Sequence, residues 1–232
     1  MIERRPFDEL ASEDLGWLKA RRHFSSAAND DRSPTGWGCM RVWNDEEIAP
    51  NTGFALQVHD NIEIVIYVRE GTVTHRDSLG NEGRIEAGNV QIVSAGTGIR
   101  HAEYNLEQSP TKIFQIWIIP NQRGGQPAWG AKPFPKGDRS GRLVTLASGF
   151  AEDKGTLPIR ADARVLGATL KAGESVDYAL GERRNGYLVP ARGTVEVNGV
   201  RVDTRDGAAI KDEATVKITA VEDSEIVLVD AA

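Results

Sequence analysis

Short runs of β-branched and aromatic residues, separated by turn-forming residues, recur along the whole chain. The clearest runs lie at 62–68, 72–75, 90–93 and 113–119, and we expect each of them to form a strand. Glycine, proline or asparagine stands close to the ends of these runs, where such residues favour turns. Short strands with a turn about every 8–12 residues are typical of antiparallel sandwiches and barrels. The pattern therefore predicts an all-β protein.

The second half of the chain repeats the pattern of the first. Residues 67–73 resemble 189–195, with a glycine at the same place in both segments. In the second copy, Asn198-Gly199 predicts a two-residue hairpin turn between two valine-rich strands. An internal duplication is the simplest explanation. We therefore expect two antiparallel β-barrel domains, jelly-roll-like and packed together.

A stretch rich in glycine, proline and charge, 121–142, separates the two halves and is typical of a linker or a long surface connection. We predict an N-terminal domain at 1–125, a connecting segment at 126–145 and a C-terminal domain at 146–232. A chain of 232 residues is long enough for two domains of this size, each with its own hydrophobic core.

Composition argues against several kinds of protein. The chain has 34 acidic and 28 basic residues and a net charge of −6, whereas a nucleic-acid-binding protein usually has a basic face. The sequence has no run of the roughly 20 apolar residues that span a membrane, and its charged start lacks the apolar run of a signal peptide. The single cysteine, Cys39, excludes an intrachain disulfide and fits a reducing compartment. We expect a cytoplasmic protein without direct nucleic-acid or membrane binding.

Two pairs of polar residues point to the chemistry. Gln57 and His59 are two residues apart in one predicted strand, and His101 and Glu103 are two residues apart in another. Side chains on a strand alternate between its faces, so both members of each pair point the same way. Two facing strands can thus direct three or four ligand-type groups at one point, which builds a metal site. No histidine follows residue 101, so the second domain cannot hold a metal through imidazole.

Each of these residues also has an ordinary structural explanation. A buried histidine that bonds a nearby carboxylate is the alternative for His101 and His59. A buried Gln57 would satisfy backbone groups or hold a water molecule. His75 lies beside a predicted hairpin turn, where we expect a surface position or a supporting role behind the ligands, and we expect His23 to pack in the core.

A larger set of motifs resembles a known family. The pattern Gln57-x-His59-x-x-x-Glu63, followed by Gly71, Gly88 and His101-x-x-x-Asn105, resembles the paired motifs of the cupin superfamily. The pirin branch of that superfamily has similar sequences at the positions that correspond to residues 16–18, 23–25, 41–45, 53–54, 75–81 and 94–105. The resemblance implies a bicupin with a metal site in the N-terminal barrel. Bacterial pirin-like proteins are often described as quercetin 2,3-dioxygenases, and other members act as redox-responsive or transcription-associated proteins.

The resemblance also implies a ligand set. In the family, three histidines and a glutamate bind the metal, and they fall on positions 57, 59, 101 and 103. Gln57 departs from this pattern, because its neutral carbonyl oxygen is a weaker ligand than imidazole for transition metals. His59, His101 and Glu103 still make the two-histidine, one-carboxylate set of non-haem iron oxygenases. Glu63 is a second carboxylate close by in sequence, but the pirin pattern favours Glu103. The expected cofactor is one divalent transition metal, iron first, with manganese, nickel, cobalt, copper or zinc as alternatives.

The activity implied by the resemblance is opening of the ring of a flavonol such as quercetin. The metal would act as a Lewis acid on the flavonol, and Glu103 would serve as a ligand and as the base that takes the hydroxyl proton. The alternative is a non-catalytic metal or redox sensor, or a regulatory binding protein, with a degraded site. We expect a monomer that binds a small aromatic substrate, and protein partners are left open.

The sequence also allows a simple structural prediction for the tryptophans, for Cys39 and for one pair of arginines. The tryptophans are core candidates, and any of them near a barrel mouth could stack on a flavonoid ring. We expect Cys39 to be a small buried residue, because a redox-sensing thiol needs exposure and a lowered pKa. The pair Arg183-Arg184 is too short for a basic patch, and with Glu182 before it we expect a solvated turn.

Overall fold

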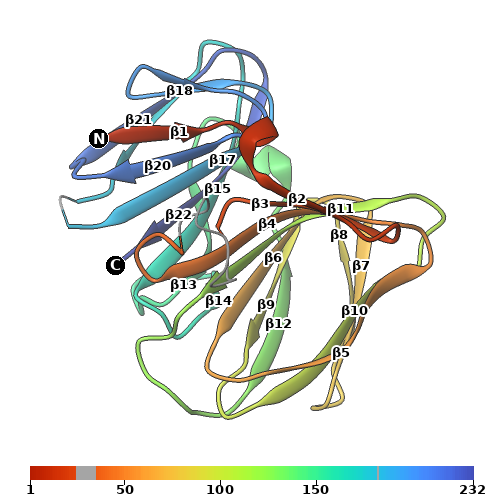
Figure 1. Ribbon diagram of the computed structural model, residues 1–232. Coiled ribbons are helices and arrows are strands. Elements are labelled where there is room, and N and C mark those ends of the chain that lie inside the picture. The colour runs from red at the N-terminus through yellow and green to blue at the C-terminus, as the bar shows by residue number, and fades with distance from the viewer. Residues whose placement is uncertain (25–34, 182) are drawn as a thin grey trace.

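The computed structural model describes residues 1–24, 35–181 and 183–232, so Ser25 and Glu182 of the motifs above lie outside the described residues. Its regular secondary structure is almost entirely β, and the strands form two barrel-like domains in contact with one another (Figure 1). Each domain has a seven-stranded and a four-stranded sheet. The all-β fold with two packed antiparallel domains is therefore confirmed. Within the described residues, no helix is long and apolar enough to cross a membrane.

In the N-terminal domain, the larger sheet has the strand order β12-β9-β6-β11-β4-β3-β2 and the smaller sheet the order β5-β10-β7-β8. The strands of the larger sheet are β2 (Ala11–Asp14), β3 (Leu18–Arg22), β4 (Met40–Ile48), β6 (Glu63–Glu70), β9 (Asn89–Ser94), β11 (Thr111–Ile118) and β12 (Ala128–Pro133). Those of the smaller sheet are β5 (Thr52–His59), β7 (Thr72–Asp77), β8 (Glu82–Glu86) and β10 (Ile99–Asn105). The four runs predicted from the sequence form most of β6, β7, β9 and β11.

In the C-terminal domain, the orders are β1-β20-β17-β22-β15-β13-β14 and β16-β21-β18-β19. The larger sheet contains β1 (Ile2–Arg5), β13 (Val144–Ser148), β14 (Leu157–Pro158), β15 (Ala163–Leu170), β17 (Asn185–Arg192), β20 (Gly207–Lys211) and β22 (Ser224–Ala231). The smaller sheet contains β16 (Ser175–Ala179), β18 (Val195–Val197), β19 (Val200–Val202) and β21 (Thr215–Ala220). Two short 3₁₀ helices, η1 (Phe7–Glu9) and η2 (Lys136–Arg139), complete the described elements.

The two domains repeat one topology. The order β9-β6-β11-β4 in the first domain corresponds to β20-β17-β22-β15 in the second, and each smaller sheet corresponds as a whole. The turn at Asn198-Gly199 joins β18 to β19 with positive φ at both residues (45° and 82°), as a two-residue hairpin turn requires. The repeated sequence pattern thus coincides with a repeated strand order.

Sheet membership departs from the predicted domain ranges in two places. β1, at the start of the chain, pairs with β20 in the sheet of the C-terminal domain. β12 lies within the expected connecting segment, but it pairs with β9 and closes the edge of the N-terminal sheet. β1 supplies backbone hydrogen bonds to β20, and β12 supplies them to β9. Without these partners, β20 and β9 would be sheet edges with unpaired backbone groups.

The two larger sheets pack face to face and share one hydrophobic core. Its members alternate along the strands with residues that face the interior of each barrel, because neighbouring side chains of a strand point to opposite sides. On β11, for example, Phe114 and Ile116 face the second domain, and Gln115 and Trp117 face the interior of the first. Polar contacts supplement this core: Tyr67 of β6 donates a hydrogen bond to Glu225 of β22, and Arg139 donates one to the Tyr67 hydroxyl (3.0 Å).

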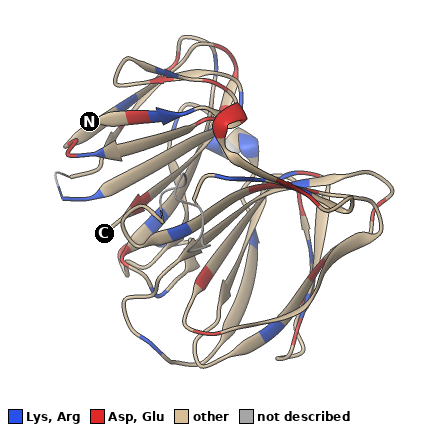
Figure 2. Ribbon diagram, in the orientation of Figure 1, with Lys and Arg blue, Asp and Glu red and all other residues tan. Residues whose placement is uncertain are grey.

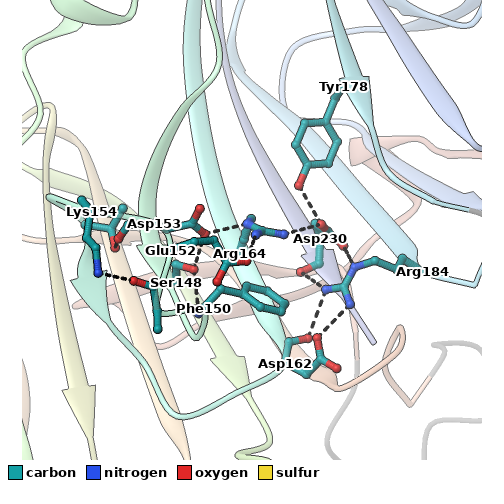
Figure 3. A network of polar contacts seen from close by, with 12 residues as sticks. Ser148, Phe150, Glu152, Asp153, Lys154, Asp162, Arg164, Tyr178, Arg184 and Asp230 are labelled. Atoms are coloured by element: carbon teal, nitrogen blue, oxygen red, sulfur yellow. Dashed lines mark hydrogen bonds and ion pairs between the residues drawn. The ribbon is translucent and has the colours of Figure 1, made fainter.

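A network of ion pairs joins the end of the C-terminal sheet to neighbouring loops (Figure 3). The buried Asp230 of β22 accepts hydrogen bonds from Tyr178 (2.6 Å) and Arg184, and Arg184 also binds Asp162 (2.8 Å). The Phe150 ring lies against the guanidinium of Arg164 at 4.0 Å. The expectation of a solvated turn is therefore wrong for Arg184, because its side chain is only 21% exposed and pairs with the buried Asp230. Elsewhere, acidic and basic residues are interspersed over both domains (Figure 2).

His23 packs between the domains, as expected from the sequence. Its side chain is buried against Trp43 of the first domain and Tyr187 of the second, and its Nδ1 lies 2.9 Å from the Tyr187 hydroxyl. Burial, together with nearby arginines, lowers the pKa of His23 from 6.5 to about 3. The folded protein therefore keeps this imidazole neutral in a range where the unfolded chain protonates it.

Stability should fall on acidification because of His23. The unfolded chain binds an additional proton below pH 6.5, so this residue alone should lower the free energy of unfolding by about 1.4 kcal/mol per pH unit between roughly pH 6 and 3. In His23→Phe, which keeps a ring in the same place, chemical denaturation should show a flatter dependence on pH. Equal slopes for the variant and the wild type would contradict this role.

Gly71 joins β6 to β7 with a φ of 77°, a conformation that residues with a Cβ rarely adopt. An added Cβ would lie 2.6 Å from Oγ1 of the buried Thr111 and 3.0 Å from its Cα. Gly80, with a φ of 87°, offers a matched comparison, because among the described residues nothing lies within 4 Å of a Cβ added there. Both positions need glycine for the backbone, but only Gly71 also needs it for space.

Replacing these glycines should separate backbone strain from steric overlap. Gly80→Ala should lower the free energy of unfolding by about 1–2 kcal/mol, the cost of a left-handed alanine. Gly71→Ala should lower it by about 2–4 kcal/mol, because overlap with Thr111 adds to the same strain. Urea denaturation of both variants measures the difference, and equal losses would mean that Thr111 moves aside freely.

Candidate metal centre

Strand β10 brings the candidate ligands together because it lies between β5 and β7 in the smaller sheet. The pairing with β5 sets His101 opposite Gln57, and the pairing with β7 sets Glu103 opposite His75. A register shift between His101 and Glu103 on the β5 side offsets the two halves of that pairing. The inward faces of three strands therefore meet at one place in the interior of the N-terminal barrel.

Three of these side chains form a compact cluster. His75, His101 and Glu103 are all buried, and each offers a ligand atom within 4.8 Å of the other two. Oε1 of Glu103 lies 3.4 Å from Nδ1 of His101 and 4.0 Å from Nδ1 of His75. Metal–ligand bonds of about 2.1 Å place neighbouring ligand atoms roughly 3–4 Å apart. The spacing of the cluster therefore fits a transition-metal ion.

Buried nitrogen atoms without partners support the same conclusion. Among the described residues, neither ring nitrogen of His101 has a hydrogen-bond partner, and neither does Nδ1 of His75. A buried polar atom without a partner costs free energy, so each such atom in a native protein needs an explanation. A metal ion bound by imidazole nitrogen and carboxylate oxygen provides one, and the donor set matches the preferences of first-row transition metals.

His75 was missed as a ligand candidate by sequence reasoning, and its suggested surface position is wrong, since the side chain is fully buried. Its Nε2 lies 3.1 Å from Oδ2 of Asp77, which in turn accepts hydrogen bonds from Asn81. Such a carboxylate fixes the histidine ring and its tautomer, leaving Nδ1 free toward Glu103. The strand pattern contained a signal: His75 shares the face of the buried Val73, two residues before it.

His59 lies beside the cluster on its more open side. Its half-buried ring is 5.0 Å from the ring of His101 and 5.0 Å from that of Trp117. Burial and the neighbouring His101 lower the pKa of His59, which favours the neutral imidazole that can bind a metal. The side chain of Gln57 is exposed, and its Oε1 lies 3.3 Å from Nε2 of His59. The alternative of a buried Gln57 that satisfies backbone groups is therefore wrong.

The carboxylate of Glu103 is held in place from a second side. Nε2 of Gln91 donates a hydrogen bond to Oε1 of Glu103 (2.6 Å), and Trp129 donates one to Gln91 (3.1 Å). Burial raises the pKa of Glu103, but contacts with the imidazoles of His101 and His75 outweigh it and lower the pKa to about 2. Glu103 is thus an anion throughout the physiological range, as a metal ligand must be.

Glu63, the other carboxylate considered, points elsewhere. It is buried at the start of β6 and accepts a hydrogen bond from the hydroxyl of Ser94. Glu63 is not part of the group of described residues whose ligand atoms lie close enough together to share an ion. The carboxylate of Glu63 therefore bonds Ser94 of the neighbouring strand β9 and takes no part in the cluster.

A cavity of about 630 Å³ opens beside His59. Aromatic side chains form part of its wall, with Trp17 and Phe54 in edge-to-face contact at 5.2 Å and Trp117 next to His59. Polar groups from β4 and β11 line another part, among them Glu46. A partly aromatic cavity with a few converging polar groups is what a small-molecule site requires.

The corresponding interior of the second barrel is filled with aliphatic side chains. The inward face of β21, which takes the place of β10, carries Val216 and Ile218, and both are buried in the core of that domain. The described part of that domain therefore offers no counterpart to the cluster.

Comparison with known proteins agrees with this architecture. Residues 4–118 match the pirin family, and residues 145–231 match the family described as quercetinase C-terminal cupin domain. The chain belongs to the pirin family. A pirin-like protein of Caulobacter vibrioides is 66% identical over 232 residues, which is 100% of both chains. The bicupin fold predicted from the sequence is thus confirmed.

Comparison with Escherichia coli bears on the site in two ways. A protein described as quercetin 2,3-dioxygenase is 39% identical over 232 residues, covering 99% of this chain and 98% of the relative. The crystal structure of the bacterial pirin YhhW in complex with nickel(II) has a TM-score of 0.92 and 36% identity, and the match covers 100% of this chain and 99% of that one.

Cys39 does not have the properties of a redox-sensing thiol. It is only partly exposed, and burial raises the pKa of its thiol, whereas a reactive cysteine needs a lowered pKa. Its backbone N–H bonds the carbonyl of Ala232, so Cys39 connects the start of β4 to the end of the chain.

Metal content tests the cluster directly. Purified wild-type protein should hold about one transition-metal ion per chain, and His101→Ala should abolish binding, because His101 lies in the middle of the candidate ligands. Glu63→Gln is the matched control, since it changes a buried carboxylate outside the cluster. Elemental analysis after dialysis measures both. Equal metal content in wild type and His101→Ala would show that the ion binds elsewhere.

Proposed function

We propose that this pirin is a metal-dependent dioxygenase that opens the ring of a flavonol such as quercetin. The observation that carries the proposal is a buried histidine–glutamate cluster, with unpartnered nitrogens among the described residues, beside an aromatic-lined cavity. The relative described as a quercetin 2,3-dioxygenase supports the reaction and the substrate class.

In this proposal His59, His101 and Glu103 hold one divalent transition metal, iron first, with manganese, nickel, cobalt, copper and zinc as alternatives. The relative that holds nickel supports a metal of this kind. When bound, the ion supplies Lewis acidity toward the oxygen atoms of a flavonol. His75 either adds a ligand or orients Glu103, and its bond to Asp77 suits both roles, because it directs Nδ1 toward the carboxylate.

The cavity suits a flat aromatic substrate. Its volume lies within the range of roughly 300–1,000 Å³ that small-molecule sites occupy. Trp17 and Trp117 offer ring faces and edges against which a flavonol can pack, which is the role expected for tryptophans near a barrel mouth. Most of the remaining polar groups project from β4, β5 and β11, so they can orient the hydroxyl groups of the substrate.

Gln57 favours a second candidate, a metal-dependent sensor or regulatory binding protein without turnover. An exposed neutral amide stands where the family has an imidazole, so the ion is held by fewer strong ligands. The raised pKa of Cys39 counts against a thiol-based redox version of this candidate.

Gln57→His should strengthen metal binding. The new imidazole would stand next to His59 and opposite His101 in the sheet. There it would bind the metal or orient a neighbouring ligand, and either effect should raise the metal affinity about 10–100-fold. Competition with a chelator of known affinity measures the change, and Val58→His, on the other face of β5, is the control. An unchanged affinity would place position 57 outside the ligand set.

Dioxygen uptake with quercetin tests the activity. Protein loaded separately with each metal should consume one dioxygen per quercetin with at least one of them, and His101→Ala should not. Carbon monoxide release provides an independent measure. If all loaded forms bind metal and quercetin without uptake of dioxygen, the sensor candidate is favoured.

A further inference from the structure

A second buried carboxylate, Glu46, faces the same cavity as His59 but lies apart from the metal cluster. It sits on β4, where Val42, Asn44 and Glu46 share the inward face and the intervening residues face the second domain. Its side chain is only 3% exposed. An acidic residue is rarely buried to this extent without a strong partner, so its position needs an explanation.

The partners of Glu46 are neutral amides rather than a cation. Nδ2 of Asn44 donates to Oε1 (3.0 Å), and Nε2 of Gln115 donates to Oε2 (3.3 Å). Gln115 is itself fixed, because its Oε1 accepts a hydrogen bond of 2.7 Å from the indole of Trp117. Trp117 packs against His59 at 5.0 Å. The carboxyl group is therefore held in a defined orientation, along a chain of contacts that leads to the candidate ligands.

Charged groups around Glu46 partly cancel. Glu103 on β10 and Asp45 on β4 disfavour its ionisation, and Arg22 on β3 favours it. Arg22 is already paired with Glu13, which also lines the cavity. Burial is the largest effect, and together these influences raise the pKa of Glu46 to about 7. A carboxyl group with this pKa exchanges a proton readily near neutral pH, which suits a general base.

We propose that Glu46 is the base that takes the hydroxyl proton of the bound flavonol. This inference rests on the proposed function and assigns to Glu46 a step for which Glu103 was the sequence-based candidate. In the step, the O–H bond of the substrate breaks, its electron pair stays on the substrate oxygen, and a new O–H bond forms on the Glu46 carboxylate. The proton then leaves to solvent through the open side of the cavity.

The arrangement favours Glu46 over Glu103 for this task. Oε1 of Glu103 already accepts a hydrogen bond from Gln91 and lies 3.4 Å from Nδ1 of His101, so this oxygen is engaged with Gln91 and with the cluster. Each oxygen of Glu46 accepts one amide hydrogen bond and keeps a lone pair for a substrate hydroxyl. One carboxylate can thus remain a ligand while the other changes its protonation state.

The test is an anaerobic titration of metal-loaded protein with quercetin, followed by absorbance. A bound flavonol that has lost its hydroxyl proton absorbs at longer wavelength than the neutral form. In the wild type, the deprotonated fraction should rise as pH increases through about 7. In Glu46→Gln, quercetin should still bind, but the pH of half-deprotonation should rise by one unit or more. Turnover should fall about 10²–10⁴-fold, the usual contribution of a general base.

Two further variants complete the design. Glu47→Gln changes the neighbouring carboxylate on the opposite face of β4 and should behave as wild type. Glu46→Asp keeps an acid at the site, so it should retain the pH dependence with a lower rate, and it replaces Glu46→Gln if that variant does not fold. An unshifted deprotonation profile in Glu46→Gln, or an unchanged rate in Glu46→Asp, would overturn the assignment of the base. Failure of the wild type to bind quercetin would instead overturn the proposed function and this inference together.

Discussion

The central constraint on this structure is that the central strands of its large sheets are buried on both faces. On β4, β6 and β11 of the N-terminal domain, one set of alternating residues packs against the second domain, and the other set faces the interior of the first barrel. Because a strand cannot slide by one residue without exchanging these sets, the shared core between the domains fixes the register of the residues that line the cavity. The positions of Glu46 and Gln115 therefore depend on Trp43 and Phe114, which lie on the opposite face of the same two strands.

The two barrels show what one topology can do with different interiors. In the second domain the smaller sheet directs valine and isoleucine inward, and the interior closes into a hydrophobic core. In the first domain the corresponding strands direct histidine and glutamate inward, and the interior keeps polar atoms without partners among the described residues. The second barrel contributes a tightly packed hydrophobic surface against which β4, β6 and β11 lie, which suits a site whose side chains must hold their orientation.

The fold and part of the candidate site could be predicted from the sequence. Spacing by two residues placed His101 and Glu103 on one inward face, because that inference needs only the geometry of a single strand. His75 was not found, because its burial depends on a third strand and on the stacking of its ring against Trp129 at 4.9 Å. The role inferred for Glu46 could not be predicted either, since it depends on an amide from β11 and on the distance of the site from solvent. Which residues share one face of a strand is a local property, whereas the contacts that a side chain makes with other strands and sheets depend on the whole fold.

The pairing of β1 with β20 has a consequence for how the molecule assembles. Ile2 and Ile210 are partners in one sheet although more than 200 residues of chain lie between them. The β1 edge of this sheet can form only after residues 207–211 have been synthesised, because these residues make up its partner strand. Closing so long a loop is slow relative to local hairpin formation. We therefore expect β1 to dock late in folding, after the local hairpins of both domains have formed.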